Sequence, residues 1–206
     1  MILDQSENNK RIAKNTLLLY FRMFFTMAVT LYTSRVILKA LGVEDFGIYN
    51  VVAGIVTLFS FFSGALSSAA SRFISFELGS NNTSYLSKVF SAIFIIHLLF
   101  SVVVVCFAET IGLWVVNCKL TIPPERIFAA HVVYQFSVFS CIVGIMQIPL
   151  NAMIIAHERL GIYAYMSICE VIGKLSIAFV VTYCSFDHLI VYGMLLFSFC
   201  LLYTSD

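Results

Sequence analysis

Charged residues are scarce in this sequence, and their scarcity excludes the ordinary classes of soluble protein. Asp, Glu, Lys and Arg make up only 11% of the 206 residues, whereas 61% are hydrophobic. Soluble domains usually contain about 25% charged and about 45 to 50% apolar residues. The net charge of +1 also leaves no basic excess with which to bind nucleic acid. The composition therefore predicts a polytopic membrane protein that has no nucleic-acid partner.

Several other signals are missing. With three prolines and ten glycines, the chain has no low-complexity linker. The cysteines lack the close pairing of zinc or redox motifs, and we interpret them as small hydrophobic residues in helices: Cys106, Cys118, Cys141, Cys169, Cys184 and Cys200. No Gly-rich phosphate loop, nucleophile elbow or His-Glu-x-x-His motif occurs. We therefore expect no metal, no cofactor and no enzymatic activity.

Long apolar stretches dominate what remains. Six stretches approach the roughly 20 residues that a membrane-spanning helix needs: 16–39, 46–70, 89–108, 127–155, 162–184 and 189–203. None alternates with a period of two, so all six are predicted to be helical. Basic residues are more frequent in the N-terminus and in the second and fourth connections between predicted spans than in the first, third and fifth connections. This bias predicts that the N-terminus is cytoplasmic.

The first predicted span carries polar residues at helical spacing. Thr26, Thr30 and Thr33 follow Arg22 at intervals of three and four residues, which places all four on one side of a helix. A charge that faces lipid costs a few kcal/mol or more, so this side is expected to face protein or a water-filled cavity. A cationic cavity favours an anionic passenger. The alternative is that Arg22 snorkels to the cytoplasmic head groups.

Two further features lie inside predicted spans. Glu170 and Lys174 are four residues apart with the acid first, the favoured orientation of a helical ion pair. They form either a self-neutralised pair or a site in which Glu170 binds a proton or sodium ion and Lys174 tunes it. Pro149 removes a backbone hydrogen bond and bends the fourth span. Such a bend suits a hinge in a moving helix, and it equally suits static packing.

Four short motifs give the chain a resemblance to a known family. They are Asn15-Thr16-Leu17 with Arg22, the predicted loop from Leu41 to Tyr49 (LGVEDFGIY), Ser71-Arg72-Phe73, and Glu158-Arg159-Leu160-Gly161. In this order they resemble polysaccharide biosynthesis membrane proteins of the Wzx flippase type. That family belongs to the multidrug/oligosaccharidyl-lipid/polysaccharide exporter superfamily.

The resemblance implies the fold of the multidrug and toxin extruders, in which two six-helix lobes surround a central cavity and work by alternating access. Residues 1–206 would form the N-terminal lobe. The last predicted span ends at Tyr203, close to the end of the chain, and from this we also expect that the complete protein continues into further membrane helices.

The activity implied by the resemblance is to flip an undecaprenyl-pyrophosphate-linked oligosaccharide repeat for O-antigen or capsular polysaccharide. The membrane would be the bacterial inner membrane. Arg22 would bind the pyrophosphate, and Thr26, Thr30 and Thr33 would line the route. The implied partners are the lipid-linked oligosaccharide, the membrane lipid, and the polysaccharide polymerase and chain-length proteins.

Three other functions remain open. An ion-coupled drug or cation antiporter of the same fold typically needs a carboxylate in the cavity of its first lobe. The first predicted span contains no Asp or Glu, and Glu170 has Lys174 one turn away. A lipid II flippase also carries a polyprenyl pyrophosphate, so the residues do not separate it from the flippase interpretation. A membrane scaffold that transports nothing would give the polar side of the first span no purpose.

Overall fold

Helices account for all the regular structure in residues 2–79, 83–157 and 160–205, the part of the chain that the computed structural model describes. They are α1 (Ile2–Thr57), α2 (Ser60–Gly79), α3 (Thr83–Phe107), the π-helix η1 (Ala108–Gly112), α4 (Leu113–Cys118), the 3-10 helix η2 (Pro124–Arg126), α5 (Ile127–Ala156), α6 (Leu160–Thr182) and α7 (His188–Ser205). The prediction of an all-helical chain is confirmed for these residues. The Glu158-Arg159 pair of the family motif lies outside them.

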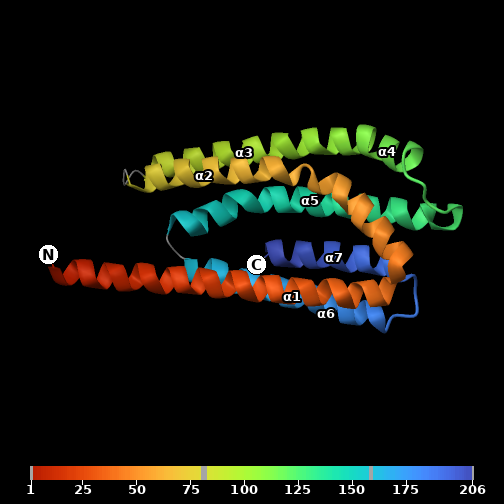
Figure 1. Cartoon of the computed structure of the whole chain (residues 1–206). Coiled ribbons are helices and arrows are strands. Elements are labelled where there is room, and N and C mark those ends of the chain that lie inside the picture. Colours follow the sequence, from red (N-terminus) through yellow and green to blue (C-terminus); the bar gives the residue numbers. More distant parts are fainter. Residues whose placement is uncertain (1, 80–82, 158–159, 206) are drawn as a thin grey trace.

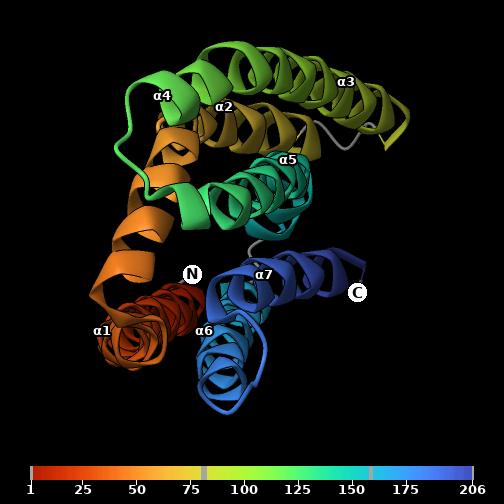
Figure 2. The same cartoon turned by 90° about the vertical axis from the view of Figure 1, so that its right-hand side faces the viewer.

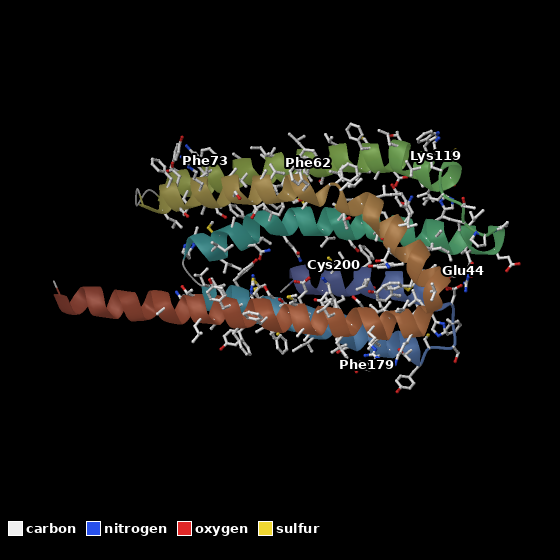
Figure 3. The ribbon with its side chains drawn as sticks, in the orientation of Figure 1. Glu44, Phe62, Phe73, Lys119, Phe179 and Cys200 are labelled. Atoms are coloured by element: carbon white, nitrogen blue, oxygen red, sulfur yellow. The ribbon has the colours of Figure 1, made fainter. Side chains whose placement is uncertain are left out.

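Four helical stretches among the described residues are long and apolar enough to cross a membrane: Asn15–Thr57, Tyr85–Cys118, Pro124–Ala156 and Leu160–Thr182. A shorter apolar helix spans His188–Leu202. Large aromatic side chains such as Phe62, Phe73 and Phe179 lie on the outside of the bundle (Figure 3). Because an apolar surface of this extent belongs in lipid, the chain is a helical membrane protein. The count of six spans stays a prediction.

The connection between the first two predicted spans differs from expectation. The predicted loop from Leu41 to Tyr49 is wrong, because these residues are helical apart from Gly42. Gly42 has φ 80° and ψ 171°, a left-handed conformation that glycine adopts without a steric penalty. The helix α1 turns sharply at this residue (Figure 1). The second predicted span is instead divided by a turn at Leu58 and Phe59, between α1 and α2.

The third predicted span is longer than expected, because α3, η1 and α4 form one helical stretch that ends at Cys118. Its π-helical turn begins at Ala108, whose carbonyl oxygen accepts a hydrogen bond of 2.7 Å from the hydroxyl of Tyr134. Tyr134 is fully buried in α5. The same oxygen also accepts from the backbone nitrogen of Leu113, so the tyrosine is a second donor that ties α5 to the π-helical turn.

The helices pack in layers. The part of α1 before Gly42 lies beside α6, while α2 and α3 lie together against α5, and α7 lies between α5 and α6 (Figure 2). The larger buried cluster joins α1, α5, α6 and α7, and its fully buried members include Val52, Val133, Tyr134, Val181 and Leu189. A smaller cluster joins α2, α3 and α5. The part of α1 after Gly42 crosses from one layer to the other, along the side of a cavity.

Candidate functional site

A central cavity of about 520 Å³ lies between the part of α1 after Gly42, the start of α2, α5, α6 and α7. Its polar lining residues are Tyr49, Thr57, Ser63, Ser137, Ser140, Gln147, Glu170, Lys174 and Tyr192. The remaining lining is mostly apolar and includes Cys141 and Cys200. Cys200 lies in the middle of the bundle, between α5 and α1 (Figure 3). The cavity therefore combines hydrogen-bonding groups with apolar walls, as small-molecule and substrate sites usually do.

Glu170 and Lys174 carry the charge among the described residues that line this cavity. Lys174 Nζ lies 2.6 Å from Glu170 Oε1, so the helical ion pair expected from their spacing is present. Both side chains remain partly exposed, at 36% for Glu170 and 47% for Lys174. The pair thus contributes no net charge, yet both groups are accessible from the cavity. A passenger with hydroxyl, amide or ionic groups could displace one partner and bind the other.

Two hydroxyl groups of the cavity are available as acceptors. Ser137 Oγ donates to the carbonyl oxygen of Val133 at 2.8 Å, and Thr57 Oγ1 donates to that of Gly54 at 2.8 Å. A hydroxyl whose proton is used in this way still presents oxygen lone pairs. Lys174 therefore supplies donors that complement these acceptors in the cavity wall.

Arg22 does not line the central cavity, and its part in binding an anionic passenger stays a prediction. Its guanidinium packs against α6, where Nη1 donates to Ser167 Oγ at 3.1 Å and the carbon Cζ lies 4.6 Å from the centre of the Tyr163 ring. The physical reason is that α1 and α6 lie side by side, so partners on α6 are nearer to Arg22 than the cavity is. Arg22 Nε is buried and has no hydrogen-bond partner among the residues that the structure describes.

A second pocket of about 470 Å³ surrounds Arg22 at the junction of α1, the end of α5 and the start of α6. Its lining comprises Thr16, Leu19, Tyr20, Arg22, Met23, Ile155, Leu160 and Tyr163. A guanidinium and hydroxyl groups thus lie beside aliphatic side chains. Such a pocket matches a ligand that has both an anionic group and a hydrocarbon chain. The anionic group would contact the guanidinium, and the chain would contact the aliphatic side chains.

The structure does not bring the three threonines into a pocket with Arg22. Thr33 is buried and donates to the carbonyl oxygen of Val29 at 2.7 Å, and Thr26 donates to that of Met23 at 3.0 Å. Thr30 is exposed. None of the three belongs to the described lining of either pocket. The backbone hydrogen bonds of Thr26 and Thr33 explain how these two side chains are tolerated in an apolar helix. The part of all three threonines in a transport route stays a prediction.

Pro149 is buried inside α5, which continues past it to Ala156. The helix bends toward the layer of α1 and α6 in its C-terminal part (Figure 1). A proline removes one backbone hydrogen bond and is the usual cause of such a bend. The bend brings the end of α5 to the Arg22 pocket through Ile155. Its use as a moving hinge stays a prediction.

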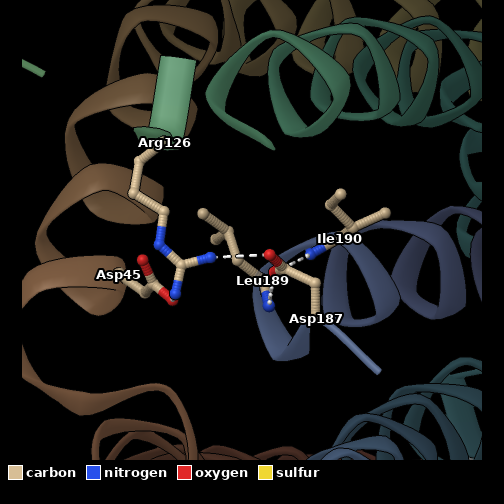
Figure 4. Close-up of polar contacts among 5 residues, drawn as sticks. All are labelled: Asp45, Arg126, Asp187, Leu189 and Ile190. Atoms are coloured by element: carbon tan, nitrogen blue, oxygen red, sulfur yellow. Dashed lines mark hydrogen bonds and ion pairs between the residues drawn. The ribbon is translucent and has the colours of Figure 1, made fainter. Parts of the chain in front are cut away.

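Sequence reasoning missed an ionic cluster at the other end of the bundle (Figure 4). Arg126 Nη2 lies 3.0 Å from Asp45 Oδ2, and Arg126 Nη1 lies 2.6 Å from Asp187 Oδ2. Asp45 is only 5% exposed. The signal was available, since all three residues lie in or next to odd-numbered connections, which share one side of the membrane when the spans alternate in direction.

No group of three or more His, Cys, Asp and Glu side chains that could hold a metal ion occurs within the described ranges. Comparison of the chain with models of known protein families, with curated proteins and with solved structures finds no match.

Proposed function

We propose that the protein moves an undecaprenyl-pyrophosphate-linked oligosaccharide from the cytoplasmic to the periplasmic leaflet of the bacterial inner membrane. The observation that carries this proposal is the composition of the Arg22 pocket. A pyrophosphate would meet the guanidinium, whose Nε has no partner among the described residues. Leu19, Met23 and Leu160 would contact the adjoining prenyl chain. The identity of the lipid and of the sugar comes from the family resemblance.

The central cavity would take the glycan. Its ion pair has no net charge, and its hydroxyl acceptors and lysine ammonium suit the hydroxyl and amide groups of a sugar repeat. With a cytoplasmic N-terminus, Arg22 near the start of the first span would lie on the loading side. The mechanism implied by the resemblance is alternating access in a fold of two lobes.

Transfer between leaflets tests this proposal directly. Vesicles that contain the protein and a lipid-linked oligosaccharide are expected to expose the glycan to a lectin or glycosidase added outside, whereas protein-free vesicles are not. Lipid II in place of the oligosaccharide distinguishes a lipid II flippase, which would move that lipid instead. Equal exposure with and without the protein would contradict both versions of the proposal.

An ion-coupled antiporter of the same fold is the second candidate, and the position of Glu170 favours it. Such a transporter needs a carboxylate in its cavity, and Glu170 lines the central one. If this candidate holds, Glu170→Gln is expected to abolish efflux of a fluorescent organic cation driven by a proton or sodium gradient, because the amide binds neither ion as the carboxylate does. Glu125, which is exposed in η2, provides the matched control Glu125→Gln. Efflux that survives Glu170→Gln would exclude Glu170 as the coupling site.

A further inference from the structure

We propose that Asp45, Arg126 and Asp187 form a releasable ionic latch that closes one end of the central cavity. The proposal goes beyond the function proposed above, because it applies to any passenger. The latch joins three chain segments that are far apart in sequence: the part of α1 just after Gly42, the start of α5, and the start of α7 (Figure 4). Each of these segments continues into a helix that lines the cavity.

A second layer lies directly beneath the ion pairs. Tyr49 follows Asp45 by four residues and therefore lies one turn further along the same face of α1. Its ring contacts that of Tyr192 on α7 edge to face, with the ring centroids 4.9 Å apart, and both residues line the cavity. An ionic layer and an aromatic layer thus separate the cavity from this end of the bundle.

The three charged groups are held unequally. Asp187 is fixed, because its Oδ1 accepts hydrogen bonds from the backbone nitrogens of Leu189 at 3.0 Å and Ile190 at 3.4 Å at the start of α7. Asp45 is buried, and its Oδ1 has no hydrogen-bond partner within the described part of the chain. The side chain of Arg126 is 36% exposed. The side chain of Asp187 is exposed to a similar extent, at 34%, so water reaches both groups. Arg126 bridges the two aspartates, and its release would free both of them.

The segment that carries Asp45 also has a point about which it can turn. Gly42 lies three residues before Asp45 and is the one residue with non-helical dihedral angles within the described part of α1. A Cβ built on Gly42 would meet nothing within 4 Å, so the surrounding space is open. Release of Arg126 would therefore allow the part of α1 after Gly42 to swing and separate Tyr49 from Tyr192. This movement would open the cavity at the latch end.

Two native cysteines make the opening measurable, because Cys141 and Cys200 line the cavity. The test uses the protein in sealed vesicles with its other four cysteines replaced by alanine, together with a membrane-impermeant maleimide applied to one side. The latch side is identified in a separate variant that retains Cys118, which is exposed at the end of α4. Glu44 and Lys119 lie at this same end (Figure 3) and provide matched control substitutions.

Arg126→Gln is expected to raise the labelling rate of Cys141 and Cys200 from the latch side on the order of tenfold, since it removes both ion pairs. Asp45→Asn and Asp187→Asn should each raise the labelling rate less than Arg126→Gln does. Arg126→Lys should give a rate between those of the wild type and Arg126→Gln, because an ammonium cannot bridge both carboxylates as the planar guanidinium does. Lys119→Gln and Glu44→Gln should leave the rate unchanged. Unchanged labelling in Arg126→Gln, or an equal rise in either control, would overturn the proposal.

Loss of folding is distinguished by a reporter remote from the cavity. Val104 is 2% exposed in α3, so a cysteine introduced there reacts in detergent only when the bundle unfolds. Val104→Cys is expected to stay unreactive in Arg126→Gln and Asp187→Asn. If every variant that breaks the latch exposes this reporter in parallel with Cys141 and Cys200, the cluster holds the fold together and the proposal is overturned.

Discussion

Replacement of Arg22 by alanine is expected to reduce transfer of the lipid-linked oligosaccharide by roughly a hundredfold, while the protein still inserts and folds. Loss of one member of a hydrogen-bonded charge pair costs about 2 to 5 kcal/mol, and each 1.4 kcal/mol is a factor of ten. Arg22→Lys should recover part of the activity, because an ammonium keeps the charge but loses the planar fork that pairs with two phosphate oxygens. The measurement is glycan exposure in vesicles as a function of lipid concentration.

Arg35 provides the matched control, since it lies on the same helix as an exposed arginine. Arg35→Ala removes an equal charge without changing the Arg22 pocket. Its transfer rate should stay within about twofold of the wild-type rate, because no specific contact is lost. A second control, Ser167→Ala, removes the hydroxyl that Arg22 contacts at 3.1 Å and should have a smaller effect than Arg22→Ala. Wild-type transfer in Arg22→Ala would remove Arg22 from the mechanism.

The helices were predictable because apolar runs of membrane length leave the backbone few alternatives. The positions at which the helices bend or end were not predictable. Gly42, Glu44, Asp45 and Gly47 indicated a loop, yet the chain departs from helical geometry only at Gly42. The turn at Leu58 and Phe59 gave no clear signal, since both residues are apolar and the nearest glycines, Gly54 and Gly64, lie inside the adjoining helices. The apolar composition alone therefore does not locate this break.

For the candidate site, contacts within one helix were predictable and contacts between helices were not. The pair of Glu170 and Lys174 was predictable, because residues four apart in a helix are neighbours whatever surrounds them. The partners of Arg22 were not, because Tyr163 and Ser167 meet it only through the way α1 packs on α6. Spacing within one helix places side chains on a face. It does not say which other helix covers that face, so the pocket around Arg22 could not be located from the sequence.

A large stability loss from a single added methyl group is expected at Gly112, in the π-helical turn. A Cβ at this position would overlap the hydroxyl oxygen of Tyr134, which is fully buried and hydrogen-bonded to the carbonyl oxygen of Ala108. Alanine in a helix gains up to about 1 kcal/mol over glycine, but overpacking and the loss of a buried hydrogen bond each cost about 1 to 3 kcal/mol. Gly112→Ala should therefore destabilise the protein overall. The measurement is its thermal unfolding midpoint in detergent, which should be lower than that of the wild type.

A double-mutant cycle identifies the cause of this loss. Tyr134→Phe removes the overlapping oxygen and the hydrogen bond together, so it should cost about 1 kcal/mol alone. Combined with Gly112→Ala it should cost clearly less than the sum of the two, because both substitutions act on the same contact. Gly54→Ala is the matched control, since a Cβ at Gly54 meets nothing within 4 Å. Strict additivity in the cycle, or an equal loss in Gly54→Ala, would show that the contact with Tyr134 is not the cause of the loss.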